Sequence, residues 1–323
     1  MNESIDSTLS SWRLIEASVR GQAHEATGMP CQDFSESAML GRDHALLVVS
    51  DGAGSARFSD KGSKIACETV LRVLSERVEE RREGYRLSDL SDALIEAHKA
   101  VVEQAESQGL KPREFACTMI ALIVDRSRGL CAHIGDGAIV IELEDGSYVA
   151  MSLPEKGEYA NETSFLIDKN FLDEIRLREL QFPAPVKGAA IFSDGIERFT
   201  LDLKTGQPYA PFFGPMLNHA RTSSNPDNLK AELIDYLNST PVKARSDDDK
   251  SLAMAVFLDT SSLLQPQNPE SATAVPSSTS IHADSLGNKE SRVFENIEKQ
   301  TCWWQNSILN RMLDIFRKFI LSN

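Results

Sequence analysis

The 323-residue sequence predicts an α+β fold in which antiparallel β-sheets form a sandwich packed with paired long helices. Short apolar runs follow one another along the chain and are joined by tight turns, as in β-hairpins. Two longer segments repeat apolar residues every three or four positions, as in amphipathic helices. The sequence contains no G-x-G-x-x-G and no Walker-type glycine loop, so nothing in it indicates a βαβ nucleotide-binding fold.

The expected strands are the short apolar runs, and two pairs of them are predicted to be hairpins. The runs comprise residues 45–50, 117–124, 130–134, 138–143, 148–151, 189–192 and 252–258. Turn residues 125–129 separate the second and third runs, and Glu144-Asp145-Gly146 separates the fourth and fifth.

Two amphipathic helices are expected within residues 66–78 and 87–105. The first repeats Ala66, Val70, Val73, Leu74 and Val78, and the second repeats Leu87, Leu90, Leu94, Ala97, Val101 and Ala105. Each set forms one apolar face, which has to be buried against another element.

The charge, the hydropathy and the cysteines indicate which binding partners and which cellular location the sequence favours. With 34 Lys and Arg against 48 Asp and Glu, the net charge is −14, which disfavours a nucleic-acid partner and suits bound divalent cations. No run of 18 apolar residues occurs and the N-terminus is polar, so neither a membrane span nor a signal peptide is expected. Five cysteines without a C-x-x-C pair favour neither a zinc site nor a disulfide framework. The predicted location is the cytoplasm.

The chain is expected to change character near Thr260. Residues 1–260 are predicted to form the globular domain, and residues 261–292, with eight Ser, two Thr and three Pro, a flexible linker. Residues 293–323 are predicted to form an amphipathic helix with Trp304, Ile308, Met312, Ile315 and Phe319 on one face. That helix is expected to fold back on its own domain, to self-associate, or to dock on a partner. Its few cations favour a protein groove over a membrane.

Aspartates gather at the ends of the expected strands. Asp51, Asp136 and Asp194 each follow an apolar run and precede glycine, Asp247, Asp248 and Asp249 precede the last strand, and Asp33 lies in Cys31-Gln32-Asp33. A single Asp-Gly pair is typical of an ordinary turn. Carboxylates gathered at one sheet edge would repel one another unless cations lay between them, so the full set predicts a Mg²⁺ or Mn²⁺ site.

Five of these segments together resemble a known family. The segments are Cys31-Gln32-Asp33, Val48-Val49-Ser50-Asp51-Gly52-Ala53-Gly54-Ser55, Ile134-Gly135-Asp136-Gly137, Phe192-Ser193-Asp194-Gly195-Ile196 and Asp248-Asp249-Lys250-Ser251. In this order they are similar to the motifs of the type 2C metal-dependent serine/threonine protein phosphatases. The resemblance extends from about His24 to Leu258. It implies a four-layer α-β-β-α sandwich, two antiparallel sheets flanked by helix pairs, with two Mg²⁺ or Mn²⁺ ions at one end.

The resemblance also implies roles for individual residues. Asp51 would bridge both ions, the carbonyl of Gly52 would be a ligand, and Asp194 and Asp248 would bind one ion. Asp33 would lie beside the metals as a catalytic residue. Asp249 aligns with the family's Asn or Asp and Ser251 with its Thr, while Asp247 is a register alternative to Asp248. A water activated by the two metals would attack the phosphorus of a phosphoserine or phosphothreonine.

Three departures from the family pattern affect how phosphate is held. Gly28 replaces the family's phosphate-binding Arg, Gln32 replaces an acid, and Arg198 stands where a third-metal acid is common. A third metal is therefore not expected. His24 and Arg198 are the predicted catalytic candidates for holding phosphate, and Arg20 is a nearby alternative to His24. His24 could also orient a metal-bound water or be a structural histidine.

The leading prediction is a phosphatase acting on phosphoproteins, similar to a bacterial subgroup of the family. That subgroup suggests a cognate serine/threonine kinase as a possible substrate. Two alternatives stay open at the level of sequence: a pseudophosphatase adaptor that binds phosphoproteins, and a two-metal hydrolase of small phosphate esters.

Overall fold

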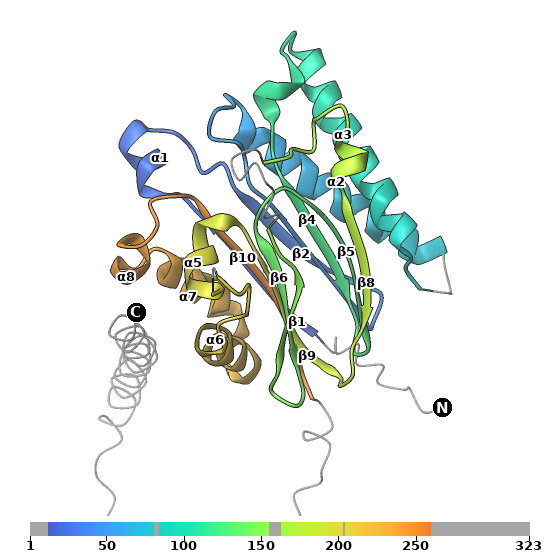
Figure 1. Ribbon diagram of the computed structural model, residues 1–323, viewed down its shortest axis with the longest axis vertical. Coiled ribbons are helices and arrows are strands. Elements are labelled where there is room, and N and C mark those ends of the chain that lie inside the picture. Colours follow the sequence, from blue (N-terminus) through green and yellow to red (C-terminus); the bar gives the residue numbers. More distant parts are fainter. Residues whose placement is uncertain (1–11, 81–83, 155–162, 203, 260–323) are drawn as a thin grey trace, which may run out of the picture. The chain divides into compact units, whose positions relative to one another are not determined.

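Ten strands form two antiparallel sheets of five in the computed structural model, which describes residues 12–80, 84–154, 163–202 and 204–259 (Figure 1). The first sheet has the order β1 (Trp12–Val19), β10 (Lys250–Phe257), β9 (Val186–Phe192), β6 (Ala138–Leu143) and β7 (Tyr148–Ser152). The second has the order β2 (Phe34–Leu40), β3 (His44–Ser50), β4 (Met119–Val124), β5 (Arg128–Ile134) and β8 (Arg176–Gln181). The two predicted hairpins are present as β4–β5 and β6–β7.

The central strands are apolar throughout because both of their faces are covered. In β3, Leu47 and Val49 pack between the sheets, while Leu46 and Val48 pack against the helices outside. A strand buried on both faces has no solvent side on which polar residues would be favoured. The uninterrupted run 45–50 is therefore the expected sequence for this position.

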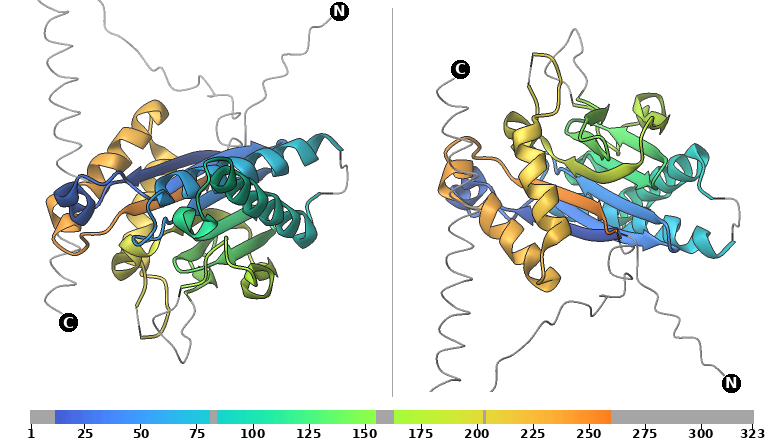
Figure 2. Two further views of the ribbon diagram at one scale, coloured as in Figure 1. Left: turned by 90° about the horizontal axis from the view of Figure 1, so that it is seen from above. Right: turned by 90° about the horizontal axis from the view of Figure 1, so that it is seen from below.

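Helices cover the outer face of each sheet. The long helices α2 (Ser59–Glu80) and α3 (Leu87–Ser107) lie on the second sheet, while α6 (Ala210–Thr222) and α7 (Leu229–Leu237), with the short α5 (Glu197–Thr200) and α8 (Thr240–Lys243), lie on the opposite side of the strands (Figures 1 and 2). The predicted α+β sandwich of two antiparallel sheets flanked by helices is confirmed.

Further elements were not among the expected ones. Strands β1, β2 and β8 carry many partly exposed polar residues, so their apolar signal is weak. Helix α6 contains Pro215, and the short α1 (Gln22–Thr27), the 3₁₀ turn η3 (Pro226–Asn228) and α4 (Phe171–Glu174) bury little.

The predicted linker 261–292 and C-terminal helix 293–323 lie outside the described residues, as does most of the N-terminal segment. In the part of the chain that the structure describes, no helix has the length and apolarity needed to cross a bilayer.

Candidate metal centre

Strand ends from both sheets meet at one edge of the sandwich. The antiparallel register sets Ser50 at the end of β3 opposite Phe34 at the start of β2, and Val19 at the end of β1 opposite Lys250 at the start of β10. Phe192 at the end of β9 lies beside Ala138 at the start of β6. The aspartates that precede or follow these strands therefore come from distant parts of the sequence to one place.

The backbone of the Asp51-Gly52 turn is held rigidly against the start of β4. The N–H of Asp51 donates to Oγ1 of Thr118 over 2.9 Å, and the N–H of Thr118 donates to the carbonyl of Asp51 over 2.8 Å. A Cβ at residue 52 would lie 2.6 Å from the carbonyl oxygen of Gln32 and 2.8 Å from Cβ of Ser59. Only glycine fits this approach, which explains the glycine after Asp51.

Three carboxyl groups lie together at the centre of this edge, that of Asp33 buried and those of Asp51 and Asp194 half-buried. The carboxyl of Asp51 is within hydrogen-bonding reach of those of Asp33 and Asp194. Burial, followed by the charges of Asp33, Asp194 and Asp136, raises the pKa of Asp51 well above its ordinary value. The pKa of Asp33 rises to about 7, chiefly through burial, and burial followed by the charge of Asp136 raises that of Asp194 to about 6.

These carboxyl groups have too few hydrogen-bond donors. Oδ2 of Asp33 accepts a hydrogen bond from Oγ of Ser193 over 2.7 Å, but Oδ1 of Asp33 and Oδ1 of Asp194 are buried without a donor in the described part of the chain. The buried Oε1 of Gln32 is likewise unpaired there. Buried oxygens of this kind are unfavourable unless protons or cations meet them.

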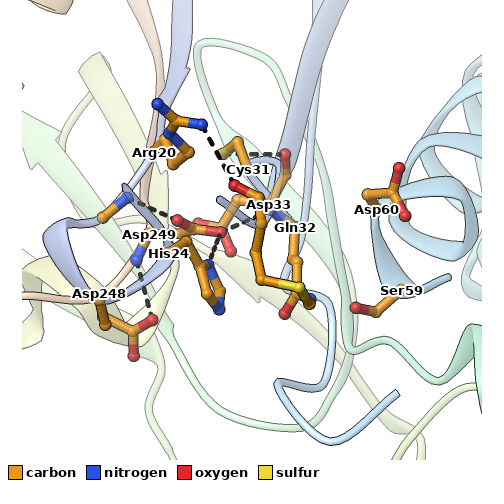
Figure 3. Close-up of polar contacts among 12 residues, drawn as sticks. Arg20, His24, Cys31, Gln32, Asp33, Ser59, Asp60, Asp248 and Asp249 are labelled. Atoms are coloured by element: carbon orange, nitrogen blue, oxygen red, sulfur yellow. Dashed lines mark hydrogen bonds and ion pairs between the residues drawn. The ribbon is translucent and has the colours of Figure 1, made fainter. Parts of the chain in front are cut away.

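Asp248 and Asp249 are neighbours with opposite surroundings (Figure 3). Asp248 is exposed, yet partial desolvation of its carboxyl followed by the charge of Asp249 raises its pKa, and its charge raises the pKa of Asp194 in turn. Asp249 is 2% exposed and accepts three hydrogen bonds, from the N–H groups of Gly21 and Gln32 and from the ring of His24. Asp248 is therefore the one of the pair that is available to a ligand.

Glycine 195 lets the Asp194 turn approach this loop. A Cβ at residue 195 would lie 1.8 Å from the carbonyl oxygen of Asp249, so any larger residue would push the two aspartate segments apart. The Asp-Gly pairs at 51 and 194 thus serve close packing of two backbones rather than a hairpin turn.

The predicted phosphate-binding residues lie at the edge of the centre and differ in their contacts. His24, on α1, is bound to Asp249 through Nδ1. Arg20 is exposed and donates to the carbonyl of Met29 over 3.3 Å. Arg198 is exposed on α5, and it is Glu197 beside it whose charge acts on Asp194. Gly28 is the left-handed C-cap of α1, with φ at 71°.

Two residues at the centre were not assigned a role from the sequence. Asp136 was noted only as part of a motif, but its charge raises the pKa values of both Asp51 and Asp194, and its Oδ2 accepts a hydrogen bond from Thr163. Ser193 connects Asp33 to β10, because its Oγ accepts the N–H of Ser251 over 3.0 Å. The Gly-Asp-Gly pattern at 135–137 was a signal for the first. The second depends on a contact that no local pattern reveals.

The residues present fit divalent cations. Among the described residues, no three His, Cys, Asp or Glu side chains converge on one point, so an ion would be held by one or two carboxylates with backbone oxygens and water. Mg²⁺ and Mn²⁺ are commonly held in this way, since Mg²⁺ keeps several waters and prefers oxygen ligands. The unpaired oxygens of Asp33 and Asp194 are the atoms that such ions would satisfy.

Comparison with known proteins identifies the family. The Protein phosphatase 2C family model matches residues 20–238. Serine/threonine-protein phosphatase 3 of Escherichia coli (strain K12) is 33% identical over 255 residues, 77% of this chain and 100% of that protein. The chain therefore belongs to the protein phosphatase 2C family. The predicted enzyme class, a protein serine/threonine phosphatase, is confirmed.

Solved structures with a similar fold are more distant in sequence. A sex-determining protein of C. elegans is 14% identical with a TM-score of 0.55, over 77% of this chain and 65% of that chain. PppA, described as a key regulatory component of T6SS in Pseudomonas aeruginosa, is 19% identical with a TM-score of 0.51, over 77% of this chain and 98% of that one. At such identities the similarity concerns the fold alone.

Proposed function

We propose that the protein hydrolyses phosphoserine and phosphothreonine on protein substrates at this carboxyl centre, with two Mg²⁺ or Mn²⁺ ions as cofactors. The observation that carries the proposal is the close group of carboxyls of Asp33, Asp51 and Asp194, in which Oδ1 of Asp33 and Oδ1 of Asp194 are buried without a donor in the described part of the chain. A relative named as a serine/threonine-protein phosphatase supports the substrate class. Both Mg²⁺ and Mn²⁺ suit an oxygen-rich site, and the choice between them is left to the experiment.

In this proposal Asp51, the carbonyl of Gly52, Asp194 and Asp248 hold the ions. Bound ions would supply a water activated at neutral pH and would neutralise charge on the phosphoryl oxygens. Asp33, held by Ser193, lies against Asp51 and keeps that carboxyl in place. His24 and Arg198, with Arg20 as the alternative, are proposed to contact the phosphate, because Gly28 offers no side chain there.

The adaptor alternative finds less support than catalysis. A protein that only bound phosphoproteins would have no need of buried carboxyls without donors, because such groups destabilise the metal-free fold. In the described part of this chain, Asp33 and Asp194 keep such oxygens at the edge where the strands meet.

The proposed setting is the cytoplasm, with a phosphoprotein as substrate and a serine/threonine kinase as a candidate. We further propose that the C-terminal segment 293–323 binds a partner or a second copy rather than contributing to catalysis. Deleting it should leave aryl phosphate hydrolysis intact and abolish self-association or partner co-purification. Loss of aryl phosphate hydrolysis on deletion would contradict that division.

The test of the proposed function is hydrolysis of a phosphothreonine peptide and of p-nitrophenyl phosphate by the full chain. With Mn²⁺ both substrates should be hydrolysed, and with Mg²⁺ the rate should be equal or lower. Adding a chelator should abolish hydrolysis of both. Peptide binding without turnover under every metal condition would favour the adaptor. Turnover of p-nitrophenyl phosphate but of no phosphopeptide would favour the small-ester hydrolase.

A further inference from the structure

Asp249 is a buried carboxylate that is hydrogen-bonded by two backbone N–H groups and by the ring of a histidine. Its Oδ1 accepts the N–H of Gly21 over 2.6 Å, and its Oδ2 accepts the N–H of Gln32 over 2.5 Å. Nδ1 of His24 lies 2.9 Å from the same Oδ2. With two backbone donors fixing it, this carboxylate can hardly turn, so it fixes the histidine ring in one orientation (Figure 3).

The backbone around His24 is fixed as well. The N–H of Ala23 donates to the carbonyl of Asp247 over 2.9 Å, which ties the start of α1 to the aspartate loop. The carbonyl of His24 accepts the N–H of Met29 over 3.0 Å, so the end of α1 is also closed. Helix α1 thus carries a histidine whose main chain and ring are both anchored on the segment 247–249.

One ring nitrogen of His24 remains for a ligand. An ionised carboxylate only accepts hydrogen bonds, so Nδ1 carries the proton that is shared with Asp249. The side chain of His24 is 18% exposed, and Nε2 has no hydrogen-bond partner among the described residues. By contrast, both ring nitrogens of the buried His133 are engaged, by Ser152 and by the carbonyl of Asp136. His24 is therefore the histidine at this edge that can reach a substrate.

The ring of His24 lies near Asp248, one of the candidate metal ligands. In Figure 3 the ring of His24 and the carboxylate of Asp248 extend to the same side of Asp249. Desolvation raises the pKa of Asp248 overall, but His24 is close enough to that carboxyl to lower its pKa slightly. A phosphate ester held by ions at Asp51, Asp194 and Asp248 would meet Nε2 of His24 on the side of Asp248.

We propose that His24 is the proton donor to the leaving-group oxygen of the phosphoserine or phosphothreonine, and that Asp249 is the positioning residue that orients its ring. The inference rests on the proposed function. As the bond between phosphorus and the serine or threonine oxygen breaks, its electron pair stays on that oxygen, which takes the proton from Nε2. The oxygen of a water forms the new bond to phosphorus and loses a proton to solvent, and His24 is reprotonated from solvent.

The pairing of a histidine with a buried carboxylate suits this task. A carboxylate on Nδ1 holds the imidazole in one tautomer and stabilises the protonated ring, which can then give its Nε2 proton to a leaving group. Proton donation of this kind contributes roughly 100- to 10,000-fold to the rate where the leaving group is poor, as an alkoxide is. A nitrophenolate leaves readily without a proton. Turnover of p-nitrophenyl phosphate therefore measures the steps that do not depend on proton donation.

The experiment compares the two leaving groups in the variant His24→Gln. With Mn²⁺, kcat for a phosphothreonine peptide should fall about 100-fold or more. For p-nitrophenyl phosphate the lost phosphate contact should raise KM, while kcat falls less than about fivefold. The affinity for Mn²⁺, measured by titration of the folded protein, should be unchanged. The control is His219→Gln, which removes a histidine paired with Glu232 over 2.6 Å on α6 and α7 and should leave both rates unchanged.

A double-mutant cycle separates positioning by Asp249 from a purely structural role. Asp249→Asn should lower peptide turnover about tenfold, and it should have no further effect once His24 is Gln, because Asp249 acts through that ring. Where Asp249→Asn does not fold, judged by circular dichroism, the leaving-group comparison on His24→Gln decides alone.

Equal losses for both substrates in His24→Gln, or a loss of Mn²⁺ affinity of tenfold or more, would overturn the inference. Additive effects of the two substitutions would overturn the role of Asp249. A wild-type protein that hydrolyses neither substrate would instead contradict the proposed function itself.

Discussion

The aspartates at one edge of the sandwich differ in how many hydrogen-bond donors their carboxyl groups receive. Asp249 has three donors, including two backbone N–H groups, and no acceptor of its own is left unmet. Asp33 and Asp194 each retain a buried oxygen without a donor in the described part of the chain, and they lie against Asp51, a third acid. Burial raises the pKa values of the second group above their ordinary range.

The difference teaches how to tell a structural carboxylate from a ligand. The carboxylate of Asp249 receives hydrogen bonds from two backbone N–H groups, so the fold itself supplies its donors. At the proposed metal centre donors are few, and the raised pKa values of Asp33 and Asp194 favour their protonated forms in the metal-free protein. The adjacent Asp248 belongs to neither group, because it is exposed and accepts the N–H of Asp249 over 2.8 Å.

The largest effect is expected when the central acid loses its charge. Asp51→Asn should abolish turnover of both p-nitrophenyl phosphate and a phosphothreonine peptide, since a neutral amide is a poor bridge between two cations. The metal-free protein should unfold at the same temperature as wild type or higher, because the repulsion from Asp33 and Asp194 is removed. Activity within tenfold of wild type at saturating Mn²⁺ would contradict the assignment of Asp51.

The next effect separates the aspartates that precede β10. Asp248→Ala should reduce turnover about 100-fold and weaken Mn²⁺ binding, as expected for loss of a ligand. Asp247→Ala, a matched change one residue earlier on the same exposed loop, should alter turnover less than about threefold. An inactive Asp247 variant beside an active Asp248 variant would show that the register is wrong by one residue.

A smaller effect is expected on the stability of the metal-free protein as the pH changes. A carboxyl with a raised pKa holds its proton more tightly in the folded chain than in the unfolded chain, so the free energy of unfolding falls as the pH rises between the two values. The ordinary pKa of 3.8 represents the unfolded chain. In the folded chain the pKa is about 7 for Asp33 and about 6 for Asp194. The Tm of the metal-free protein should therefore fall between pH 4 and pH 7.

Saturating Mn²⁺ should reverse this trend, because protons and metal ions compete for the same oxygens. The rise in Tm caused by Mn²⁺ should be larger at pH 7 than at pH 5, measured by calorimetry. Asp51→Asn is the control, and its metal-free Tm should depend less on pH. A wild-type Tm that is flat over this range would contradict the raised pKa values.

Much of the fold was predictable because its signals are local. The runs 45–50 and 138–143 correspond to β3 and β6 within one residue, since strands covered on both faces are apolar throughout. The edge strand β8 was missed because most of its side chains face solvent and leave no apolar run. The amphipathic segment 87–105 lies within α3, whose apolar face packs on the second sheet.

The sequence predicted which aspartates lie at the centre, but not which of them are held by hydrogen bonds from the backbone. Motif order brings Asp33, Asp51 and Asp194 to one edge, and the structure has them in contact. What separates Asp249 from Asp248 is the pair of N–H groups on Gly21 and Gln32, 228 and 217 residues away in the chain. Such a difference depends on tertiary contacts, and no spacing within the motif Asp248-Asp249-Lys250-Ser251 contains it.

The smallest expected effect concerns one hydrogen-bond donor to Asp33, the hydroxyl of Ser193. Ser193 is 1% exposed, and its hydroxyl lowers the pKa of Asp33 by donating to Oδ2. Ser193→Ala removes that hydrogen bond, so the pKa of Asp33 should rise further and a cation should compete less well with the proton. A buried hydrogen bond to a charged group contributes about 1.5–3 kcal/mol, so Mn²⁺ affinity at pH 7 should fall by about tenfold. The loss should shrink at pH 8.5, where the proton no longer competes, and titrations at the two pH values measure it. A loss of the same size at both would mean that Ser193 acts only by packing, and that donors to the carboxyls of the metal centre do not tune the affinity of that centre for cations.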